Sequence, residues 1–118
     1  MSRDALHPAQ PRASFQLAAG ADSRLAAEGP LTFANARIAC ALGLLQLAGA
    51  GAGAGAGAAF EIDCGALSPC DSAGLAVLLE WLGSAKRAGR RLRYVRLPPE
   101  LRALAHISEV EELLTRGV

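Results

Sequence analysis

Hydrophobic and polar residues alternate in several short stretches of this chain and recur at helical spacing in others. Residues 14–18 (SFQLA) place Phe15 and Leu17 on one side, and residues 24–30 (RLAAEGP) alternate in the same way. A period of two residues is typical of a β-strand. Since the residues between the two stretches have turn composition, the pattern predicts an antiparallel hairpin at the start of the fold.

A helical pattern follows in residues 32–48, where Thr32 has the side chain of a helix cap. The apolar residues that recur there at three- and four-residue steps are Phe33, Ala34, Ile38, Ala41, Leu42, Leu45 and Ala48. Residues 49–58 then alternate strictly between Gly and Ala. Because glycine at every second position disfavours a helix, this segment is predicted to be a flexible connector.

The second half of the chain carries the strongest periodic signals. Residues 59–64 (AFEIDC) alternate as a strand with one apolar face, and residues 65–70 (GALSPC) are predicted to be a loop. Residues 72–88 are predicted to form a helix that ends at Gly89. Its apolar stripe consists of Leu75, Leu78, Leu79, Leu82 and Ala85.

The last third is predicted to contain one more strand and two helices. Residues 90–97 (RRLRYVRL) form the strand, which ends at a Pro-Pro pair, and residues 99–107 form the first helix. Ser108 and Glu111 have the spacing of a capping box for the final helix. The order β-β-α-β-α-β-α-α predicts an α/β fold: a small mixed sheet with an N-terminal antiparallel hairpin and helices mainly on one face.

Length and composition limit the classes of protein to which the chain can belong. Its 118 residues, 52% of them hydrophobic, suffice for one domain, which we place at residues 14–118 after a loose tail at residues 1–13. A formal net charge of +1 provides no general field to attract nucleic acid. No stretch has the pattern of a signal peptide or a membrane span, so we expect a soluble cytoplasmic protein.

The cysteines do not have the spacing of a metal site. Cys40, Cys64 and Cys70 form no C-x-x-C pair, and neither His7 nor His106 lies near them in the sequence. A zinc site is therefore not expected. We predict three reduced thiols, two of them packed as small hydrophobic residues.

Residues 68–75 (SPCDSAGL) place Asp, Ser and Gly at a strand-to-helix junction. A nucleophile elbow would need a glycine two residues before Ser72, and the only histidine placed late enough to act as a base is His106. A phosphate-binding loop would need a lysine after Gly74, and none is present. No catalytic residue is therefore assigned, and Asp71 or Ser72 is predicted to cap the helix.

Residues 60–114 resemble the STAS domain, and the resemblance extends over residues 14–115. The residues that match its signature are Asp63, Asp71, Ser72, Ala73, Gly74 and Leu75, with Gly89 at the helix-ending glycine and Gly29 and Leu31 in the upstream segment. The resemblance implies a STAS fold and a protein that is not an enzyme. No cofactor or metal is expected.

Two branches of this family imply different partners. The D-S-A-G-L form, with Ala73, is similar to MlaB-like chains. This branch implies a cytoplasmic subunit that binds and supports the ATPase of an MlaFEDB-type phospholipid ABC transporter, which maintains outer-membrane lipid asymmetry, and that meets the inner membrane only through its partner. The alternative is an anti-sigma factor antagonist that a kinase partner phosphorylates at Ser72. A nucleotide- or lipid-sensing STAS module is a third alternative.

The resemblance implies a partner-binding surface around the helix start. Its predicted members are Asp71, Ser72, Ala73, Gly74, Leu75, Val77 and Trp81. Trp81 can be interpreted either as the edge of the core or as an exposed interface anchor. The arginines at positions 90, 91, 93 and 96 are interpreted as a solvated strand face that could meet an acidic partner. Glu61 and Asp63 are assigned only polar-face or loop roles.

Overall fold

The computed structural model describes residues 14–20, 24–50 and 59–118. The predicted tail at residues 1–13 and most of the Gly-Ala connector, residues 51–58, lie outside these described residues. The elements follow the order β1 (Gln16–Ala19), β2 (Arg24–Leu31), α1 (Ala36–Ala50), β3 (Ala59–Cys70), α2 (Ser72–Arg87), β4 (Arg91–Val95), α3 (Pro99–Ile107) and α4 (Glu111–Arg116).

The four described strands form one mixed sheet in the order β1-β2-β3-β4. β1 pairs antiparallel with β2, whereas β2 with β3 and β3 with β4 are parallel. Leu25 of β2, Ile62 of β3 and Tyr94 of β4 lie in register across the sheet. The predicted hairpin and the predicted mixed sheet are both confirmed.

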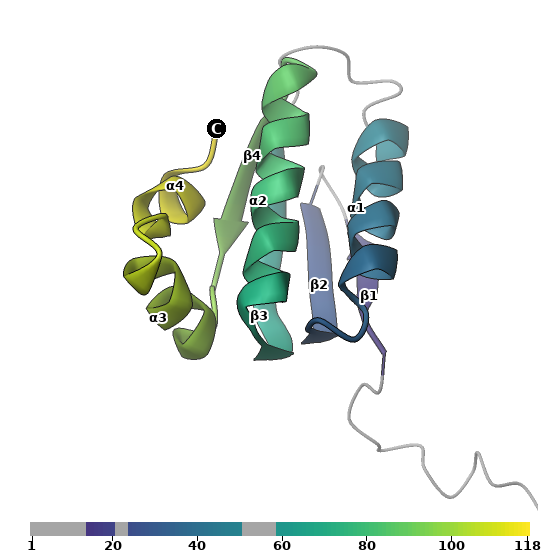
Figure 1. The fold of residues 1–118 in the computed structure, drawn as a ribbon. Coiled ribbons are helices and arrows are strands. Elements are labelled where there is room, and N and C mark those ends of the chain that lie inside the picture. Colours follow the sequence, from purple (N-terminus) through teal and green to yellow (C-terminus); the bar gives the residue numbers. More distant parts are fainter. Residues whose placement is uncertain (1–13, 21–23, 51–58) are drawn as a thin grey trace, which may run out of the picture.

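The helices lie mainly on one face of this sheet, as predicted (Figure 1). α1 and α2 run side by side across the face, and α3 and α4 lie beside β4. Alternate strand residues point under α1 and α2 and form the core with apolar residues of the helices. The fully buried larger side chains are Leu31, Ile62, Cys64, Leu67, Leu78, Trp81, Leu82, Leu92, Leu101 and Leu114.

β3 is longer than predicted, since it continues through residues 65–70, which were expected to form a loop. This second half pairs with β2, and its register shifts twice along the way. Leu67 and Cys70 are buried in the core. Pairing with β2 and burial of these side chains therefore outweigh the turn-like composition of GALSPC.

α1 begins four residues later than predicted, and Thr32 is not its cap. The carbonyl of Asn35 accepts the first helical hydrogen bond, from the backbone N of Ala39 at 2.9 Å. The Asn35 side chain holds the preceding turn: its Oδ1 accepts from the Thr32 backbone N and its Nδ2 donates to the Pro30 carbonyl, both at 2.9 Å. The amide side chain holds this turn because its acceptor and its donor are two separate atoms, which bind the Thr32 N–H and the Pro30 carbonyl at the same time.

The apolar series that marked α1 in the sequence does not line the core. Ile38, Leu42 and Leu45 are exposed, whereas Ala39 and Leu47 are buried against the sheet and α2. Nearly every residue of this helix is apolar, so hydrophobicity alone does not indicate which side faces inward.

The predicted capping box of the last helix is also wrong. Ser108 closes α3 instead, because its backbone N donates to the Leu104 carbonyl at 3.0 Å. α4 starts at Glu111 after Val110 and has no side-chain cap. The Glu111 carboxylate faces α3, where it lies 3.2 Å from His106 Nδ1 and 3.4 Å from Arg102 Nη2.

The three cysteines are free thiols, as expected. Cys64 and Cys70 are buried and Cys40 is half-buried. Burial raises the pKa of Cys70 to about 11, and it raises the pKa of Cys64 further. Two of the three thiols thus pack as small hydrophobic side chains.

Candidate functional site

The junction between β3 and α2 forms a tip that is organised by Asp71. As the N-cap residue, Asp71 has an extended backbone with φ of −132°. Its Oδ1 accepts hydrogen bonds from the backbone N of Ala73 at 2.9 Å and of Gly74 at 3.1 Å. The prediction of a cap at this position is confirmed, and the capping residue is Asp71, with Ser72 as the first residue of the helix.

The second carboxylate oxygen of Asp71 reaches a different segment of the chain. Its Oδ2 accepts from the backbone N of Phe33 at 3.0 Å, so Asp71 ties the start of α2 to the turn between β2 and α1. The hydrogen bond from Phe33 is the main cause that lowers the pKa of Asp71; bonds from Gly74 and Ala73 act in the same direction, and burial opposes them. The carboxylate therefore stays ionised at neutral pH.

Gly74 allows the first turn of α2 to approach the end of β2 closely. A Cβ atom at this position would lie 2.3 Å from the carbonyl oxygen of Leu31. That contact is with backbone and cannot be relieved by a change of rotamer. Both the signature aspartate and the signature glycine thus fix where the tip lies relative to the neighbouring segment.

Among the residues predicted to meet a partner, Ser72 is the exposed one at the tip. Asp71 and Ala73 are half-buried, whereas Gly74, Leu75, Val77 and Trp81 are buried. Within the described residues the Ser72 hydroxyl has no hydrogen-bond partner. The buried members can affect a partner only by shaping the surface above them.

Trp81 joins α2 to α1. Its side chain is fully buried, and its Nε1 donates to the carbonyl of Cys40 at 3.1 Å. The indole lies against Gly43, where a Cβ atom would be 2.0 Å from the ring, and its centroid is 6.1 Å from that of Phe15. Trp81 is therefore part of the core, and its place there sets the orientation of α1.

A shallow groove of about 450 Å³ runs from the tip between α1 and α2. Most of its lining is apolar, and one cation and one anion flank it; its residues are Ala36, Arg37, Cys40, Leu44, Ala73, Ala76, Val77 and Glu80. The α1 side of this groove was not found from the sequence. The sequence feature that could have indicated it is that only one residue between Ala36 and Ala50 is charged.

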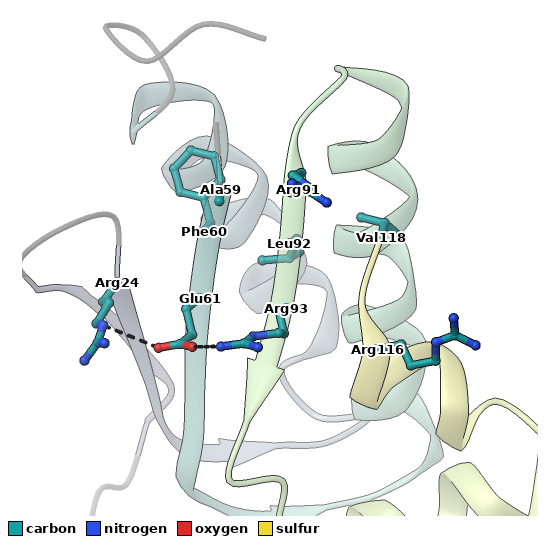
Figure 2. Close-up of a pocket in the computed structure, with 9 residues that line it drawn as sticks. All are labelled: Arg24, Ala59, Phe60, Glu61, Arg91, Leu92, Arg93, Arg116 and Val118. Carbon is teal, nitrogen blue, oxygen red and sulfur yellow. Dashed lines mark hydrogen bonds and ion pairs between the residues drawn. The ribbon is translucent and has the colours of Figure 1, made fainter. Parts of the chain in front are cut away.

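The opposite face of the sheet has a different character (Figure 2). Arginines of β2 and β4 flank Glu61 of β3: Arg24 Nε lies 3.4 Å from Oε1, and Arg93 Nη2 lies 2.5 Å from Oε2. Together with Phe60 and Leu92, these residues line a hollow of about 460 Å³. As expected for a solvated strand face, the Arg24 and Arg93 side chains are exposed, and Glu61 between them is half-buried.

Asp63, the first residue of the family signature, lies on this solvated face. Arg96 donates to its carboxylate through Nε at 3.0 Å and Nη2 at 2.8 Å, and the backbone N of Gly65 donates at 2.8 Å. The bond from Arg96 is the main cause that lowers the pKa of Asp63. Asp63 therefore connects β3 to the end of β4 and is not part of the tip.

The described residues include no cluster of three His, Cys, Asp or Glu that could hold a metal ion. The imidazole of His106 contacts Glu111 between α3 and α4. Within the same part of the chain, no helix is long and apolar enough to cross a bilayer. The tip as built offers a fixed backbone, an exposed hydroxyl and a helix N-terminus, which are the means to recognise another molecule.

Comparison with known proteins identifies the type of domain. The family model described as "Mlab, STAS domain" matches residues 14–115. Twelve chains of solved structures match. One of them, the anti-sigma factor antagonist SpoIIAA in its unphosphorylated form, is 16% identical with a TM-score of 0.58, and the match covers 80% of this chain and 83% of that one. No curated protein matches the sequence.

Proposed function

The chain belongs to the STAS domain family of the MlaB type, and on this premise we propose that it is a non-enzymatic subunit that binds a partner protein through the N-terminal tip of α2. One observation carries the proposal: Ser72 is exposed on a helix start that Asp71 fixes with three backbone hydrogen bonds from two segments. A surface held in this way loses little conformational entropy when a partner binds.

The partner that we propose is the ATPase subunit of an MlaFEDB-type phospholipid ABC transporter. The match to the MlaB-type model and the small, uncharged surface at Ser72 and Ala73 support this choice. In this role the chain supports assembly and activity of the ATPase. It is cytoplasmic and reaches the inner membrane only through its partner, and it needs no cofactor or metal.

The second candidate is an anti-sigma factor antagonist. Exposure of the Ser72 hydroxyl favours it, because a kinase must reach its acceptor, and so does the shared fold with SpoIIAA. A phosphate would add a charge of about −1.5 to −2 next to the ionised Asp71 and would prevent docking of a surface matched to the neutral hydroxyl.

Binding measurements with both partners separate the two proposals. Titration calorimetry of the full chain against the transporter ATPase is expected to show a complex, and the same titration against an anti-sigma kinase is expected to show none. Ser72→Ala should weaken the complex, while Ser108→Ala, an exposed serine at the end of α3, serves as the matched control. Binding to the kinase with formation of phosphoserine at position 72 would establish the antagonist role instead.

A further inference from the structure

The outward side of α1 is an apolar surface without a covering element among the described residues. Ile38 is 66% exposed, Leu42 41% and Leu45 69%. Their spacing of four and three residues places them on one side of the helix, and Ala41 is exposed beside them. We call these four residues the α1 crown. By contrast, the exposed side of α2 carries charged residues, which include Glu80, Lys86 and Arg87.

The crown cannot turn inward without breaking the packing of α1. Gly43 passes the Trp81 indole so closely that any side chain would collide with it, and the Cys40 carbonyl accepts the Trp81 hydrogen bond. Ala39 and Leu47 fill the remaining space against the core. A rotation of the helix would break these contacts, so the exposure of the crown is a fixed property of the folded chain.

The crown is continuous with the tip of α2. Phe33, which is 84% exposed, precedes α1 and donates its backbone N–H to the same Asp71 carboxylate that caps α2. The groove between α1 and α2 joins the two areas from the other side, since it is lined both by residues of α1 and by Ala73 and Ala76 of α2. Tip, groove and crown thus form one surface on the helical side of the molecule.

The size and charge of this surface indicate what covers it. Phe33 and the crown together expose roughly 500 Å² of apolar side chain. This lies at the upper end of the roughly 300–600 Å² that the largest, often functional, patch of a monomer covers, and below the ~800 Å² per partner of a standard interface. The crown alone is therefore small for a stable homodimer interface, and a partner that covers it also needs the adjoining groove and tip. Arg37 is the only charged residue among residues 36–48, and a helix that lies on lipid headgroups normally carries several basic residues.

We propose that the α1 crown and Phe33 form the apolar part of the docking surface for the same protein that contacts the tip at Ser72, and that this partner covers them with the apolar face of a helix. The inference rests on the proposed function, because it extends the site at the tip. A helix fits because the groove lies between two helices and its small side chains Ala36, Cys40, Ala73 and Ala76 allow close approach. In this arrangement the tip supplies specificity and the crown supplies most of the buried apolar area.

The test replaces exposed apolar residues on the crown and compares them with an equally exposed residue elsewhere. Ile38→Ser and Leu45→Ser remove the crown contacts, and Ile107→Ser removes an isoleucine of α3 that is 77% exposed. We expect each crown variant to weaken binding of the transporter ATPase by about 10- to 100-fold in titration calorimetry, and the Ile107 variant by no more than about twofold. Circular dichroism and thermal melts should match wild type for all three, since no buried residue changes.

The possible results separate this inference from the function on which it rests. If the crown variants bind like wild type while Ser72→Ala weakens the complex, the docking role of the crown is overturned and that of the tip stands. A wild-type chain that does not bind the ATPase would overturn both. A wild-type dimer in sedimentation equilibrium that becomes monomeric in either crown variant would assign the crown to contact with a second copy. Binding of wild type, but not of the variants, to vesicles of anionic phospholipid would assign the crown to lipid. Either result would overturn the inference.

Discussion

Removal of the Asp71 carboxylate tests whether this one side chain holds the tip together. Asp71→Ala deletes three hydrogen bonds, two that cap α2 and one from Phe33 in the turn before α1. Loss of a helix cap costs about 1 kcal/mol, and loss of a further hydrogen bond to a charged acceptor adds about 0.5–1.5 kcal/mol where water can partly replace it. We therefore expect the free energy of unfolding to fall by about 1.5–2.5 kcal/mol.

Urea denaturation followed by tryptophan fluorescence measures this change directly. The chain has one tryptophan, and Trp81 is fully buried between α1 and α2, so its emission reports the packing of both helices. The expected loss corresponds to a decrease in Tm of roughly 5–15 °C for a domain of this size. Asp71→Asn separates the contribution of the cap from that of the bond to Phe33. The amide oxygen can still cap α2, whereas the amide NH₂ cannot accept a hydrogen bond from Phe33.

The control for this experiment is Glu112→Ala. Glu112 forms an ion pair with Arg116 at 3.0 Å, and both side chains are largely exposed, so its removal should change stability by less than about 0.5 kcal/mol. If Asp71→Ala also falls within about 0.5 kcal/mol of wild type, water replaces the carboxylate fully. The tip would then not depend on Asp71, and the reasoning from its three bonds would be refuted.

Three further predictions follow from the same contacts. Gly74→Ala forces a methyl group onto the Leu31 carbonyl and should lower stability by about 1–3 kcal/mol in urea titrations; an unchanged midpoint would mean that α2 shifts freely. Trp81→Phe removes the hydrogen bond to Cys40 and part of a buried ring, and calorimetric melting should show a loss of about 1–3 kcal/mol. Because the pKa of Asp71 is lowered in the fold, its carboxylate stabilises the folded state at neutral pH, and this stabilisation is lost as pH falls from the ordinary pKa of 3.8 through the folded value. The difference in unfolding free energy between wild type and Asp71→Asn should therefore shrink in that range. A constant difference would contradict the lowered pKa.

The sequence predicted the tip well because the signals there are local. A cap residue and a strongly periodic helix lie next to one another at residues 71–87, and both follow from near neighbours in the chain. The hairpin and the parallel order were predictable for the same reason: short alternating stretches and connecting helices restrict the topology to a few choices. The contacts of Asp71 with Phe33 and of Gly74 with Leu31 involve a distant segment, and the sequence did not show them.

The features that the sequence did not predict depend on contacts between distant segments. The second half of β3 is a strand because β2 pairs with it, although its own composition is typical of a turn. The orientation of α1 follows from Gly43, which meets Trp81 about forty positions further along the chain. In a helix that is apolar on nearly all sides, no periodicity reveals such a contact, and the crown therefore emerged only from the structure.

The central claim is that the α2 tip docks on the ATPase of a phospholipid transporter. The most direct test measures the affinity of the wild-type chain for that ATPase and compares it with the affinities of Ser72→Ala, Ser72→Glu and Ser108→Ala. The account predicts a complex with wild type, about tenfold weaker binding with Ser72→Ala, no measurable binding with Ser72→Glu, and unchanged binding with Ser108→Ala. Equal affinity of all four proteins for the ATPase, or the absence of any complex with the wild-type chain, would contradict it.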